Sequence, residues 1–96
     1  MFDTYEVAKQ LIVRLRPMVA TLLPVDEDLA DQMRRAASSV LLNLAEGQRF
    51  MNGNKLRHYE LAHGSAHEIK GALDAAVGWG YIEQADAELA LLDRLL

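Results

Sequence analysis

Apolar residues recur at intervals of three and four along most of the chain, which is the period of an amphipathic helix. Four such segments follow one another, separated by short stretches rich in proline or glycine. The pattern predicts helices over about residues 5–22, 27 to 48 or 50, 55–77 and 84–96. No segment alternates apolar and polar residues with period two, so we predict no strands. The sequence therefore predicts an all-α protein.

The apolar stripes indicate which side chains form the core. The first stripe continues past Pro17, so we expect this proline inside a kinked helix. Trp79 and Tyr81 lie among glycines after the third helix, and we expect both rings to close the end of the core. The predicted core residues of the four helices are Tyr5, Ala8, Leu11, Ile12, Leu15, Met18, Val19 and Leu22; Leu29, Met33, Ala36, Ala37, Val40 and Leu44; Tyr59, Ala62, Ala66, Ile69, Leu73 and Ala76; and Leu89, Leu92 and Leu96.

Short turns join the predicted helices, which makes consecutive helices antiparallel neighbours. The first turn is LPVDED, where Asp26 is a plausible N-cap for the second helix, and the second turn is MNGN. We therefore predict one domain, residues 1–96, folded as an up-down-up-down antiparallel four-helix bundle. Because the chain reverses near Asn52, Ser39 should lie opposite Ser65 across the second and third helices.

A second stripe of the 27–48 helix is polar but carries short side chains. Ser39, Asn43 and Glu46 recur at intervals of four and three residues, and the antiparallel register brings Arg35 near Glu68. A stripe that only faced solvent would ordinarily carry longer charged residues. We interpret it as a structural polar network that fixes helix register or subunit orientation, with the members Arg35, Ser39, Asn43, Glu46, Ser65 and Glu68.

Basic residues gather around the turn between the second and third helices. Residues 47–59 contain no Asp or Glu, whereas the opposite end of the bundle is acidic. The register places Glu46 close to Arg57 or His58. The candidate nucleic-acid or partner surface consists of Arg49, Lys55, Arg57 and His58.

Composition excludes several classes of protein. The chain has no cysteine, its amino end is acidic where a signal peptide would be basic, and no apolar run reaches the roughly 20 residues of a membrane span. We expect a cytoplasmic protein without a membrane partner. Glu60, His63 and His67 share one helical face, but a di-iron bundle needs a second Glu-x-x-His, which is absent. We predict no metal, no cofactor and no enzymatic activity, since no nucleophile and base occur at a catalytic spacing.

Small and apolar residues outside the core stripes suggest that the protein associates with itself. Gly64, Gly71, Ala75 and Gly78 recur at helical spacing, which favours a close helix approach within the bundle or between subunits. Extra apolar side chains lie off the main stripes at Leu41, Leu42 and Leu61. We expect part of this surface to be covered in a homo-oligomer.

Three segments, RRAASSVLLNLAEGQR, HYELAHGSAHEI and GWGYI, resemble the bacterial four-helix-bundle proteins encoded in intervening sequences of large-subunit ribosomal RNA genes. That family is related to accessory proteins of diversity-generating retroelements, and the resemblance covers about residues 5–82. It implies a closed homopentameric ring of bundles. The retroelement relatives contact RNA and a reverse transcriptase through basic surfaces.

Two function classes follow from the residues and the resemblance together. The first is a non-enzymatic, ring-forming scaffold or adaptor for an unidentified partner. The alternative is an RNA- or DNA-binding accessory protein that uses the basic end of several subunits. The net charge of −4 is unlike that of a typical nucleic-acid-binding protein, because phosphate binding depends on counterion release by Lys and Arg.

Overall fold

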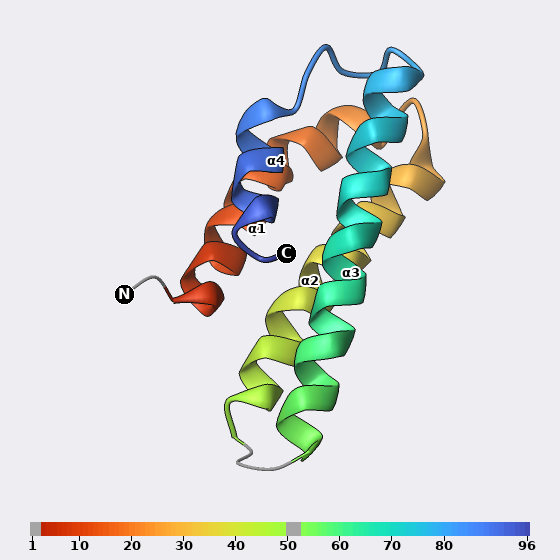
Figure 1. Ribbon diagram of the computed structural model, residues 1–96. Coiled ribbons are helices and arrows are strands. Elements are labelled where there is room, and N and C mark those ends of the chain that lie inside the picture. The colour runs from red at the N-terminus through yellow and green to blue at the C-terminus, as the bar shows by residue number, and fades with distance from the viewer. Residues whose placement is uncertain (1–2, 50–52) are drawn as a thin grey trace.

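The computed structural model describes residues 3–49 and 53–96, and this part of the chain consists of helices and connecting segments without strands. The helices are α1 (Thr4–Leu22), α2 (Glu27–Gly47), α3 (Gly53–Gly78) and α4 (Asp86–Asp93) (Figure 1). The prediction of an all-α chain with four helices is confirmed. The fourth helix is shorter than expected, since it covers 86–93 of the predicted 84–96. The alternative end of α2 at Phe50 and the reversal at Asn52 lie outside the described residues.

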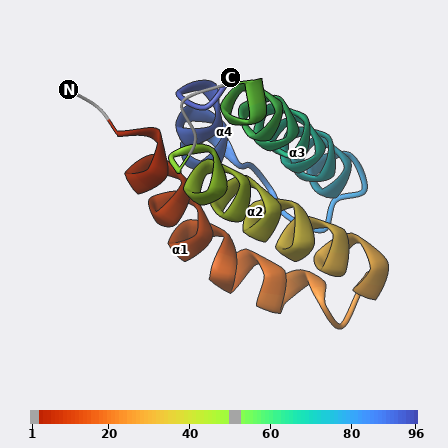
Figure 2. The same ribbon diagram turned by 90° about the horizontal axis from the view of Figure 1, so that it is seen from below.

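The helices pack in chain order around the bundle. The middle helix α2 contacts α1 on one side and α3 on the other, while α4 contacts α1 and α3 (Figures 1 and 2). This order is that of an up-down-up-down arrangement. In Figure 1 the ends of α2 and α3 near residues 47 and 53 extend beyond the short α4. Helix α4 therefore does not extend along this end of α3.

Local hydrogen bonds explain where the first two helices begin. An Asp3 carboxylate oxygen accepts a hydrogen bond from Tyr5 N at 2.9 Å, and Asp26 accepts one from Leu29 N at 3.0 Å. Each bond satisfies a backbone donor that the first helical turn leaves unpaired. The predicted N-cap at Asp26 is thus confirmed. Helix α1 also continues through Pro17, as its apolar stripe predicted.

The core contains nearly all of the predicted apolar side chains, either buried or packed against it. Two predictions are wrong. Trp79 is 74% exposed, although Tyr81 does pack against the core, and Leu96 is exposed. The backbone at Gly80 explains the first error: at φ 78° it turns the chain so that Tyr81 N donates to Ala76 O at 2.9 Å, which leaves Trp79 on the outside of the turn. No helix in the described part of the chain is long and apolar enough to cross a bilayer.

Close backbone approach occurs at Gly47 and not at the glycines of α3. A Cβ placed on Gly47 would lie 2.5 Å from Tyr59 Cε1, which shows that the aromatic ring packs directly on the last turn of α2. A Cβ on Gly64, Gly71 or Gly78 would meet no atom within 4 Å. The expected close approach within the bundle is therefore wrong for these three glycines, and the intersubunit alternative remains a prediction.

We predict that Gly47→Ala lowers the free energy of unfolding by about 1–3 kcal/mol, the usual cost of overpacking, because the new methyl group displaces the half-buried Tyr59 ring. The matched control is Gly53→Ala, which also has open space but lies outside the groove between α2 and α3, so it should not lower the free energy of unfolding. Urea denaturation at one fixed protein concentration measures both changes. Equal effects of the two substitutions would contradict the close packing at Gly47.

Candidate functional site

A chain of polar side chains crosses the contact between α2 and α3. Ser65 Oγ donates to Ser39 Oγ at 2.8 Å, and Asn43 Nδ2 donates to Ser39 Oγ at 3.1 Å and to Ser39 O at 2.9 Å. The predicted pairing of Ser39 with Ser65 is confirmed. All of these groups are partly buried, so their hydrogen bonds replace water that the helix contact excludes.

His58 extends this chain toward the start of α3. Its Nδ1 lies 3.0 Å from Asn43 Oδ1, and because an amide oxygen only accepts, the proton of this bond belongs to His58 Nδ1. The sequence placed His58 among the basic binding residues and missed this contact. The 3.6-residue periodicity of α3 could have found it, because His58 precedes Ser65 by seven residues and so shares its face.

The charged members of the predicted network lie outside it. Arg35 Nε contacts Asp31 Oδ2 at 3.3 Å, and its side chain is 68% exposed. No ion pair joins Arg35 to Glu68, although both residues line the same shallow groove. Arg34 also binds Asp31, at 2.7 Å, and this hydrogen bond with the nearby Arg charges lowers the pKa of Asp31. Arg35 therefore pairs with Asp31 on its own helix, and the ion pair between Arg35 and Glu68 across the two helices is not formed.

An open groove runs between α2 and α3 on the side away from α1 and α4. Small side chains form its floor, with Ala36, Ser39 and Ser65 at one part and Ala72 and Ala75 at another. At helical spacing from these residues, Leu42 is 64% exposed and Leu61 is 47% exposed. The predicted surplus of apolar surface is therefore real at these two leucines, whereas Leu41 packs against the core.

The basic end carries less uncompensated charge than the sequence suggested. Glu46 Oε2 lies 3.2 Å from Arg49 Nη1, so this carboxylate pairs with Arg49. The next residue, Gly47, lies beside His58, in line with the predicted register, and the closeness of Glu46 itself to Arg57 or His58 stays a prediction. Lys55 Nζ lies 5.7 Å from the centre of the Tyr59 ring, a cation–π distance. Arg57 is exposed. Lys55 and Arg57 therefore contribute the main positive charge that α3 presents at this end.

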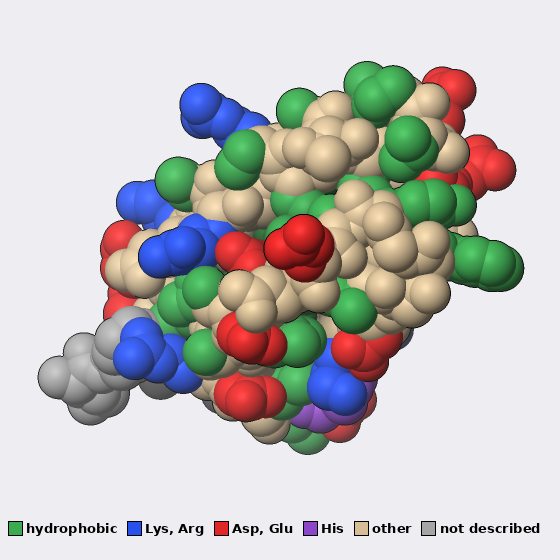
Figure 3. All heavy atoms as spheres, turned by 90° about the horizontal axis from the view of Figure 1, so that it is seen from above, with side chains coloured by type: hydrophobic (Ala, Val, Ile, Leu, Met, Phe, Trp, Pro, Cys, Tyr) green, Lys and Arg blue, Asp and Glu red, His purple; other side chains and the backbone are tan. Residues whose placement is uncertain are grey.

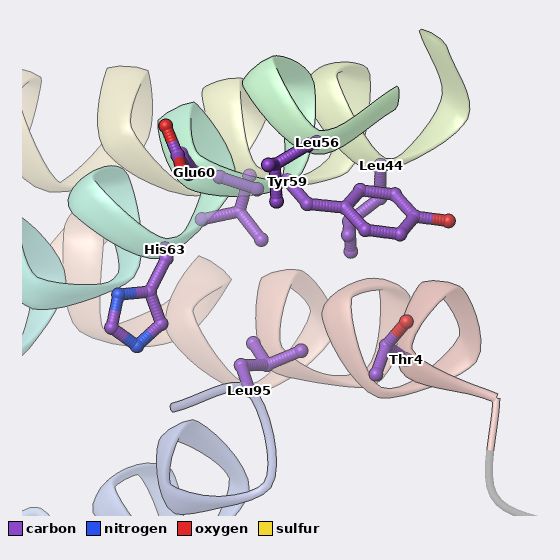
Figure 4. A pocket seen from close by; sticks show the side chains of 9 residues that line it. Thr4, Leu44, Leu56, Tyr59, Glu60, His63 and Leu95 are labelled. Atoms are coloured by element: carbon purple, nitrogen blue, oxygen red, sulfur yellow. The ribbon is translucent and has the colours of Figure 1, made fainter. Parts of the chain in front are cut away.

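An apolar pocket of about 400 Å³ opens on the other side of α3 (Figure 4). Figure 4 shows Leu44, Leu56 and Tyr59 along one wall and Thr4 and Leu95 across from them. The remaining lining residues are Val40, Glu60, Ala62 and His63. The pocket has the size and apolar lining of sites that enclose small organic groups.

The histidine pair does not form a metal centre with its neighbours. The rings of His63 and His67 meet edge to face with their centroids 4.8 Å apart. Within residues 3–49 and 53–96, no group of three or more His, Asp or Glu side chains could hold a metal ion. The role of this face stays untested.

Comparison with known proteins identifies one family. Residues 2–94 match the family described as 23S rRNA-intervening sequence protein. No curated protein and no solved structure matches the chain. The match covers all four helices of the bundle.

We predict that Asn43→Ala lowers the free energy of unfolding by about 1–3 kcal/mol, because it removes the hydrogen bonds that the partly buried Asn43 amide makes with His58 Nδ1 and with Ser39. The control is Arg35→Ala, which removes an exposed ion pair and should cost less than about 1 kcal/mol. Denaturation at a fixed protein concentration compares them. If both variants lost the same stability, the chain of hydrogen bonds would not be what holds the register.

Proposed function

We propose that this chain, which belongs to the family of 23S rRNA-intervening sequence proteins, is a non-enzymatic scaffold that assembles into a closed homopentameric ring and presents a surface to a partner. The observation that carries the proposal is the open groove between α2 and α3, together with the exposed Leu42 and Leu61 at helical spacing from residues that line it. Exposed large apolar side chains that lie together beside a groove often mark a protein–protein contact.

The groove suits a helix of a neighbouring subunit. Its floor is made of alanine and serine, and Gly64 and Gly71 of α3 have open space above them, so another helix could approach the backbone closely. Leu42 and Leu61 supply apolar area, while Arg35 and Glu68 offer opposite charges on either helix. Opposite charges on one face favour a single orientation of the incoming helix.

A ring requires two different surfaces on each subunit, since a head-to-tail contact that repeats by rotation closes on itself. The groove provides one of these surfaces. The five-fold closure itself comes from the family resemblance. In such a ring every subunit would point the same way, so a weak partner contact on each would be multiplied.

We expect light scattering to give the mass of a pentamer at micromolar concentrations. Leu61→Lys should dissociate it, because the change places a charge in the contact. The matched control is Val13→Lys on α1, another exposed apolar residue, which should leave the mass unchanged. A monomeric mass for the native chain would overturn the ring, and dissociation by both variants would remove the groove as its interface.

A second function, RNA binding, is supported by the charge at one end of the bundle. Lys55 and Arg57 lie on α3 where residues 47–59 contain no acid. One subunit offers too few phosphate contacts for tight binding, but a ring would repeat them around one rim. The pairing of Arg49 with Glu46 makes Lys55 and Arg57 the better residues to test.

We predict weak, sequence-independent RNA binding that is lost at moderate salt. Lys55→Glu with Arg57→Glu should abolish it in a low-salt gel-shift assay without dissociating the pentamer. The control pair, Arg14→Glu with Arg16→Glu on α1, alters net charge equally and should still bind. No retention by the native protein, or equal binding by both double variants, would leave the scaffold function alone.

A further inference from the structure

Trp79 is the most exposed large apolar side chain of the described residues, and it is the single tryptophan of the chain. It follows α3 directly and is flanked by Gly78 and Gly80, so no neighbouring side chain on the turn shields its ring. Tryptophan is enriched among residues that dominate protein interfaces. An indole held out in this way has the form of an anchor that inserts into another surface.

The surroundings of Trp79 are acidic. The turn between α1 and α2 and the segment that leads from the end of α3 into α4 contain no Lys, Arg or His; their acidic residues are Asp26, Glu27, Asp28, Glu83, Asp86 and Glu88. Asp31 and Asp74 lie farther along α2 and α3 and are paired with Arg34, Arg35 and Lys70. Figure 3 views the molecule from this end and shows hydrophobic and acidic side chains close together along the right-hand edge. The surface that receives Trp79 should therefore be apolar with a basic rim.

The opposite end of the same molecule has these properties. The apolar pocket lies there, between the start of α1 and the neighbouring parts of α2 and α3 (Figure 4). Leu56 lines it and is 61% exposed, so it also forms part of the mouth. Lys55 sits over Tyr59, which lines the pocket, and so places a positive charge beside the opening.

We propose that Trp79 of one copy inserts into the pocket of the next, which joins copies end to end. The indole ring fills the space between Leu44, Leu56 and Tyr59, and its Nε1–H can donate to the Glu60 carboxylate that lines the same pocket. No hydrogen bond or ion pair joins that carboxylate to another described residue. Lys55 faces the acids around Trp79, so the charges of the two ends attract while the net charge of −4 opposes other approaches.

This contact is separate from the ring of the proposed function. The pocket and the α2–α3 groove lie on opposite sides of α3, as the residues that line them show: Leu56, Tyr59 and His63 for the pocket, Ser65 and Glu68 for the groove. End-to-end joining would stack whichever unit exists in solution. An experiment can therefore disprove the ring and still support end-to-end stacking, or disprove the stacking and still support the ring.

Two variants test the contact from its two sides. Trp79→Ala keeps the pocket and removes the anchor, and Leu56→Glu keeps the anchor and places a charge at the pocket mouth. Each alone should weaken concentration-dependent association at low salt by at least about tenfold, measured by sedimentation velocity. Val13→Ala, an exposed apolar residue on α1, is the control and should associate as the native chain does. Circular dichroism checks that each variant keeps its helix content.

Mixing the two variants gives the decisive result. The Trp79→Ala chain contains no tryptophan, so emission from the mixture reports only on Trp79 of the Leu56→Glu chain. We expect this emission to shift to the blue when the Trp79→Ala chain is added. The mixture should form pairs of units but no stacks of three or more. N-acetyltryptophanamide should compete for the pocket, and about 0.5 M salt should weaken the pairing. An unshifted emission, or stacking by the Trp79→Ala chain alone, would overturn the proposal.

Discussion

The antiparallel contact between α2 and α3 fixes where the other two helices of the bundle pack. Two features hold its register: the Ser39–Ser65 hydrogen bond of 2.8 Å near the middle and the Tyr59 ring on Gly47 at the end. A slip by one residue would rotate each helix by about 100° relative to its partner and separate both pairs. The other two helices then pack on one side of this pair, with α1 against α2 and α4 against α1 and α3.

That one-sided packing decides what the protein can present to others. Because α1 and α4 cover a single side of the α2–α3 pair, the groove on the other side stays open. Because α4 has eight residues, it leaves the pocket beside Leu56 and Tyr59 uncovered as well. The pocket is mainly apolar, whereas the groove combines alanines with polar and charged side chains such as Gln32, Arg35 and Glu68.

Helix periodicity and the residue types in the turns were enough to predict much of the fold. The apolar stripes predicted the helices and nearly the whole core, and the reversal between α2 and α3 was enough to pair Ser39 with Ser65. These features depend on spacing along the chain, which is visible in the sequence. The family resemblance agrees with the match over residues 2–94.

Features that depend on competition between contacts were not predictable in the same way. Arg35 could reach Asp31 or Glu68, and proximity on its own helix decided for Asp31. Trp79 and Tyr81 both follow α3, yet the positive φ of Gly80 sends only the tyrosine inward. Gly47 and Gly71 look alike in the sequence, and only the position of the Tyr59 ring distinguishes them. Which partner each of these residues contacts depends on the three-dimensional placement of the backbone, which the sequence pattern alone does not give.

Single-cysteine labelling measures whether a neighbouring subunit covers the α2–α3 groove in the proposed ring. The native chain has no cysteine, so a thiol introduced by Gly71→Cys in the groove can be compared with one introduced by Val13→Cys on α1. A small thiol reagent should modify the first much more slowly than the second in the native assembly. Both should react at the same rate once urea unfolds the chain. Equal rates in the native state would show that the groove is open to solvent and would contradict the proposed ring.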